Sequence, residues 1–182
     1  MSLFDVVTVA LVLGYAVFGF FTGVVRRAVG LVSVFVAALA ATHAAPLASG
    51  ILRQQWGSLS VSDSRAYAWF AVFALIMAVA EFSASLVHRE LQFSVVALNR
   101  PTGAGLGLIT SIALISAFTY MLLGLAEVTG PNFGSLERSV HSSLSASVVG
   151  LPLASLVSGV ALPPFYGTLP RNPVQYFAGT SA

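Results

Sequence analysis

The chain has 182 residues, of which 57% are hydrophobic and only 8% are charged, and its mean hydropathy is +0.92. Roughly a quarter of the residues in a soluble domain are charged, so this composition excludes an ordinary water-exposed surface and favours a membrane protein. The eight basic residues are arginines scattered along the chain, which predicts no nucleic-acid partner, and the lack of cysteine excludes disulfides and thiolate chemistry.

Four long apolar runs predict membrane-spanning helices. They are Val6–Val25, Ala28–Leu52, Ala66–Val87 and Pro101–Ala126, and within them only Glu81 carries a charge. A helix needs roughly 20 residues to cross about 30 Å of hydrocarbon, and backbone groups in lipid need partners within the segment. We therefore predict an all-α integral membrane protein with four transmembrane helices, in which residues 1–126 form the transmembrane domain.

An arginine pair, Arg26 and Arg27, separates the first two runs. Two runs of this length cannot cross a bilayer as one helix, so we expect the chain to turn between Gly23 and Gly30. We also expect both arginines to be solvated at that turn and not buried. Because arginines near span ends favour the cytoplasm, the pair, together with Arg100, predicts cytoplasmic hairpins and extracytoplasmic termini.

The remaining segments are predicted to lie at the membrane surface. Residues 53–65 read as a short polar loop, with Trp56 and Trp69 at headgroup level. Residues 88–100 continue the third helix along the interface. Residues 127–182 form an extracytoplasmic tail with an amphipathic interfacial helix at about 136–160, followed by an irregular end rich in proline and aromatic residues. A fifth span over 144–162 is the alternative.

Two glycine pairs occur in the first and fourth runs. Gly19 and Gly23 form one G-x-x-x-G motif, and Gly103 and Gly107 form another. Small residues one helical turn apart let a neighbouring backbone approach closely, which is a main source of packing energy in lipid. We predict that these helices make close contacts. The pattern leaves open whether each touches the other, a second copy or a protein partner.

Glu81 is the carboxylate placed well inside an apolar run. An intramembrane acid costs a few kcal/mol unless it is paired or hydrated, which makes Glu81 a candidate functional residue. Arg26, Arg27 or Arg89 could reach it. The favoured interpretation is a structural ion pair or a snorkelling acid, and the alternative is a proton or ion relay.

Asp5 stands just before the first run, on the predicted outer side. A helix-capping role is favoured there, because an acid suits the positive end of the helix dipole. A pair with Arg53 or Arg65 of the next outer loop is the other interpretation, and such an interfacial pair would be worth about 1 kcal/mol or less.

No sequence motif indicates catalysis, a cofactor or a metal. The chain lacks a G-x-S-x-G elbow, a P-loop and a dinucleotide fingerprint, and its three histidines have no metal-ligand spacing. We therefore predict a protein that is not an enzyme and binds no cofactor, with the lipid bilayer and either a protein partner or a second copy as its contacts.

Two stretches resemble the colicin V production protein family. The opening, FDVVTVALVLGYAVFGFFTGVVRRAVGLVS, has that family's acid, glycine pair and arginine, at Asp5, Gly19, Gly23 and Arg26. The second stretch, ALNRPTGAGLGLITSIAL, has its Asn-Arg-x-x-Gly-x-x-x-Gly entry into the last span, at Asn99, Arg100, Gly103 and Gly107. The chain departs from the family pattern at Thr22 and Arg27, where members often carry a basic and an acidic residue, and at Thr110, where a lysine is common.

The resemblance implies a four-helix protein of the bacterial cytoplasmic membrane that supports bacteriocin production or export. It supplies no reaction and no catalytic residues. We therefore expect a non-enzymatic scaffold or accessory protein. The alternative is a small transporter or channel subunit that uses Glu81, which would place this acid beside a hydrated path.

Overall fold

A computed structural model describes residues 2–88, 96–128 and 135–180. In these residues all regular secondary structure is helical, as predicted. The long helices are α1 (Leu3–Gln55), α2 (Val61–His88) and α3 (Val96–Ala126). Shorter elements follow: α4 (Ser135–Ser145), α5 (Gly150–Ala161), the 3₁₀ helix η1 (Pro163–Phe165) and α6 (Pro173–Ala178). The predicted interfacial continuation at 88–100 falls largely on residues 89–95, outside the described residues.

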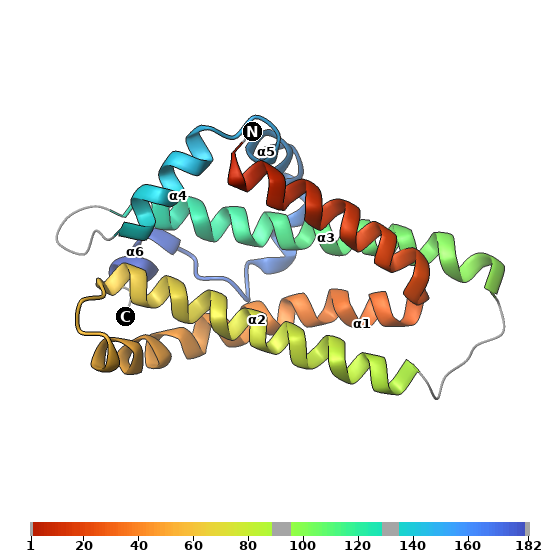
Figure 1. The fold of residues 1–182 in the computed structure, drawn as a ribbon, viewed down its shortest axis with the longest axis horizontal. Helices are drawn as coiled ribbons and strands as arrows, with labels where there is room; N and C mark the ends of the chain where they lie inside the picture. The colour runs from red at the N-terminus through yellow and green to blue at the C-terminus, as the bar shows by residue number, and fades with distance from the viewer. Residues whose placement is uncertain (1, 89–95, 129–134, 181–182) are drawn as a thin grey trace.

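Helix α1 is bent sharply at Gly23, whose φ of 78° and ψ of 176° are not helical. Glycine adopts positive φ without the steric cost that a Cβ would impose, which explains the position of the bend. In Figure 1 the two arms leave the bend and run toward the same end of the molecule. We call residues 3–22 the first arm and residues 24–55 the second arm.

In the described residues, three helices are long and apolar enough to cross a membrane: α1, α2 and α3. The four predicted runs therefore correspond to three continuous elements, because the first two runs lie in the two arms of α1. Residues 136–160 form two helices, interrupted at 146–149, where the sequence suggested one. With 12 residues, α5 is shorter than the roughly 20 that a crossing requires.

The interior of the bundle combines very small and very large side chains. On the second arm, Ala37, Ala41 and Ala45 are fully buried at helical spacing, so neighbouring helices can approach closely. Trp69 of α2 is also fully buried; it stacks on Phe73 with ring centroids 5.3 Å apart. The ring of Trp69 fills the core rather than facing outward, and its Nε1 donates to Thr42 Oγ1 at 3.3 Å.

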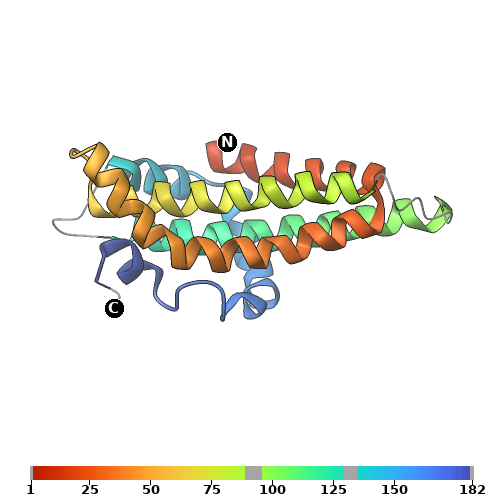
Figure 2. The same ribbon diagram turned by 90° about the horizontal axis from the view of Figure 1, so that it is seen from below.

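The end of the tail is more ordered than the sequence suggested. Figure 2 shows η1, the following segment and α6 running along one side of the bundle. Phe165 is buried and stacks on Phe35, and Phe177 is fully buried. The Tyr176 hydroxyl donates to Thr42 O at 3.0 Å, and burial raises its pKa, so it remains a donor. The predicted irregular end thus holds η1 and the short helix α6, with non-helical backbone between them at 166–172, and its aromatic residues complete the core.

Candidate functional site

The two glycine pairs pack against each other and join the first arm to α3. A Cβ at Gly19 would collide with the carbonyl oxygen of Gly103, and one at Gly103 would collide with that of Gly19. A Cβ at Gly107 would likewise collide with Tyr15 O. We call this contact the glycine seam. The sequence left open what each glycine pair contacts, and the structure shows that the two pairs contact each other within one chain. The seam holds the two backbones in direct contact.

Gly23 combines two roles at the end of this seam. Its positive φ creates the bend of α1, and its backbone lies against Gly103, where an added Cβ on Gly103 would come within 3.0 Å of Gly23 Cα. Any larger residue at Gly23 would be strained by its backbone conformation, whatever the free space. The bend and the close helix contact are therefore built at one residue.

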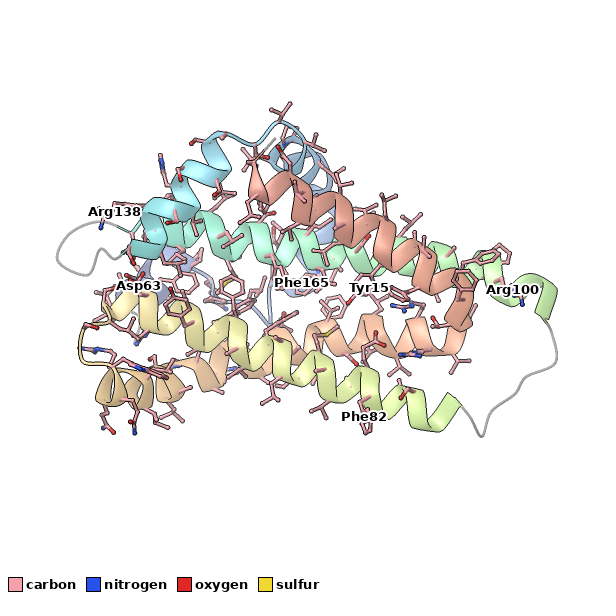
Figure 3. The ribbon with its side chains drawn as sticks, viewed as in Figure 1. Tyr15, Asp63, Phe82, Arg100, Arg138 and Phe165 are labelled. Carbon is pink, nitrogen blue, oxygen red and sulfur yellow. The ribbon has the colours of Figure 1, made fainter. Side chains whose placement is uncertain are left out.

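Arg27 is buried just beyond the bend, against our expectation that it is solvated. Its guanidinium carbon lies 5.2 Å from the centre of the Tyr15 ring, and its Nε donates to Thr22 Oγ1 at 3.1 Å. The fold-back at Gly23 turns this side chain inward, between the arms. Figure 3 shows Tyr15 pointing from the first arm into the bundle. Thr22 and Arg27, two of the departures from the family pattern, thus contact each other.

Glu81 of α2 lies against both arginines. Its Oε2 is 3.3 Å from Arg26 Nε, and its Oε1 is 3.7 Å from Arg27 Nη1. Gly30 makes room for the carboxylate, because a Cβ there would lie 3.2 Å from Oε1. The arginines begin the second arm, where the positive end of the helix dipole disfavours cations, so Glu81 offsets both the arginine charges and the dipole.

Among the described residues, Arg100 is a further cation, and it lies near the start of α3. It is exposed, and its guanidinium carbon is 6.0 Å from the centre of the Phe20 ring on the first arm. Figure 3 shows it at the same end of the molecule as the bend. Arg89, the third candidate partner of Glu81, lies outside the described residues. We call Tyr15, Arg26, Arg27 and Glu81 the charged cluster.

At the other end of the first arm, Asp5 is fully buried and caps two helices. Its carboxylate accepts from Ser2 N in a capping box at the start of α1. It also accepts from Ser147 Oγ at 2.6 Å and from the amides of Val148, Val149 and Gly150 at 3.2, 3.0 and 2.9 Å, which lie at the start of α5. The predicted cap is therefore present, but most of its bonds reach across the chain.

Asp63 caps α4 from a distance, as Asp5 caps α5. Asp63 was not identified as a candidate residue from the sequence. Its two oxygens accept from Ser135 N at 3.2 Å and Leu136 N at 3.1 Å, the first amides of α4. Figure 3 shows Asp63 on α2 beside the start of α4. The sequence signal was an acid in the first turn of a helix, with nothing to identify its distant partner. Arg65, offered as an ion partner for Asp5, instead donates to Tyr176 O.

The comparisons with known proteins identify the family. A model of the colicin V production protein matches residues 4–159, from the first turn of α1 into α5. The chain belongs to the colicin V production protein family. No curated protein and no solved structure matches it. Family membership supports a role in bacteriocin production, and the apolar helices indicate membrane association.

The charged cluster has no arrangement of nucleophile and base. It contains a carboxylate, two guanidinium groups and a phenol, which together can hold charge inside an apolar bundle. Among the described residues, no group of three or more histidines and acids could hold a metal ion. The cluster brings together side chains of the first arm, the second arm and α2, and the seam joins the first arm to α3.

Proposed function

We propose that this chain crosses the bacterial cytoplasmic membrane four times, with both termini on the outer side. The first arm is about 30 Å long and the second about 48 Å, so each can cross the hydrocarbon alone. Side chains such as Val17 and Phe21 on the first arm are exposed, as suits a lipid-facing surface. Arg26 and Arg27 follow the bend, and Arg100 of α3 lies at the same end of the molecule, which favours the cytoplasm for that end.

We further propose that the protein is a non-enzymatic membrane scaffold or accessory protein that supports bacteriocin production or export. The observation that carries this proposal is that Asp5, Asp63 and Glu81 each bind groups of the same chain. Acidic side chains that bind groups of their own chain stabilise one arrangement of the helices. The exposed apolar faces of the helices then remain available for a protein partner or a second copy.

A transporter that uses Glu81 is the competing function. Its support is that the Glu81 side chain is 26% exposed, although the two arginines neutralise its charge. The two functions are separated by flux of protons or solutes into proteoliposomes holding wild-type chain or Glu81→Gln. A scaffold gives only background flux in both. Flux above background that Glu81→Gln abolishes would contradict the scaffold.

The scaffold itself is tested by bacteriocin titre in the culture medium of a producing strain. Gly103→Leu should lower the titre, because it disrupts the glycine seam, while Gly105→Ala should not, because open space surrounds Gly105. Crosslinking in the same membranes should capture a protein partner or a second copy. Normal titre with Gly103→Leu, together with no crosslinked protein, would overturn the proposal.

A further inference from the structure

An apolar groove of about 280 Å³ lies beneath α4, between this helix, the first arm and α3. Leu3, Phe4, Val7 and Leu11 line it from the first arm. From the other helices it is lined by Ile115, Phe118, Leu122, Leu136, Val140 and Leu144. The polar groups in its lining are the hydroxyls of Thr8, Ser139 and Ser143, and none of its described lining residues is charged. Its volume is near the lower end of ligand sites.

The groove exists because α4 is attached at its two ends to different helices. Asp63 of α2 binds the amides that begin α4, and Asp5 of the first arm binds the amides that follow it, at 148–150. Figure 1 shows α4 slanting from one end of α3, near the start of α2, toward the N-terminal end of the first arm. Its apolar residues Leu136 and Val140 therefore line a space that the chain does not fill.

The surroundings of the groove determine what can fill it. Leu3 is 72% exposed and Val7 is 45% exposed on the first arm, so apolar side chains continue from the lining onto the outer surface. An apolar void left empty forfeits the dispersion contacts of its lining, and apolar cavities do not retain water. The groove thus opens onto the face of the first arm that a bilayer would cover.

We propose that this groove holds one acyl chain of a bilayer phospholipid. The inference rests on the proposed crossing of the first arm, which puts the open side of the groove in contact with lipid. The chemistry of recognition is that of a hydrocarbon chain, because the lining offers apolar contact and a few hydroxyls but no charge for a phosphate. The bound chain would fill the space between α4 and the first arm.

The test is photolabelling of the full chain in liposomes of phosphatidylcholine with a diazirine on one acyl chain. Mass spectrometry then locates the label. We expect label at residues 3–11, 115–122 and 136–144 in addition to the outward face of the first arm. Val140→Phe should fill the groove and lower groove labelling at least threefold, and Leu11→Phe should do the same from the opposite wall. Val79→Phe, at a site on α2 that is 57% exposed and lies outside the lining and both attachments, is the matched control.

The outcomes separate the groove from the proposed topology. Groove labelling that both filling variants reduce, with label at Val17 and Phe21 unchanged, supports the proposal. Unchanged groove labelling in Val140→Phe and Leu11→Phe, or label at Val17 and Phe21 with none in the groove, overturns it. If Val17 and Phe21 also carry no label, then the proposed crossing of the first arm fails as well.

Discussion

At the scale of single residues, the stability of the charged cluster depends on compensation of the positive charge of Arg27, which is buried. A buried cation without its counter-ion is costly, and Glu81 supplies that charge at 3.7 Å. We expect Glu81→Gln to lower the free energy of unfolding by about 2 kcal/mol. Denaturant unfolding of the chain in detergent micelles measures this loss.

A double substitution separates charge burial from general disruption. Arg27→Met removes the buried charge while retaining much of the volume, so adding it to Glu81→Gln should restore about half of the lost stability. Arg26→Met is the matched control, because Arg26 is partly exposed and needs less compensation. Equal stability of the two double variants would show that Glu81 does not act by compensating Arg27.

At the scale of elements, the glycine seam sets the distance between the first arm and α3. A methyl group at Gly103 would meet the backbone of Gly19 and Gly23, so Gly103→Ala should lower the free energy of unfolding by about 1–3 kcal/mol. Gly105→Ala, two residues along the same helix, meets nothing within 4 Å and should stabilise by about 0.5–1 kcal/mol. The same sign for both, measured by unfolding in micelles, would contradict the seam.

The two short helices α4 and α5 are each capped by their own distant acid. Asp5→Ala leaves the amides of residues 148–150 without their acceptor, and we expect their hydrogen exchange to accelerate at least about tenfold. Asp63→Ala should accelerate the amides of Ser135 and Leu136 in the same way. Each variant is the control for the other. Acceleration of both segments by either variant would mean that the tail docks as one unit.

At the scale of the whole molecule, the sequence predicted the individual helices better than the contacts between them. Apolar runs predicted helices because hydropathy and length are local properties, and Gly23 lies within the stretch in which a turn was expected. The burial of Arg27 depends on the direction in which α1 folds back, which composition does not encode. The capping partner of Asp5, Ser2, is local and was predictable, whereas the amides at the start of α5 are more than 140 residues away along the chain, so the docking of α5 was not.

The central claim is that the two arms of α1 cross the bilayer separately. Single cysteines can test it by labelling with an impermeant maleimide, since the chain has no cysteine. The sites are a short N-terminal extension, Val25→Cys beside the bend and Ser58→Cys after α1. Separate crossings predict that the extension and Ser58→Cys react from the outer face of the membrane, and Val25→Cys only after the membrane is opened. Reaction of the extension and Ser58→Cys from opposite faces would contradict the account, because α1 would then cross once.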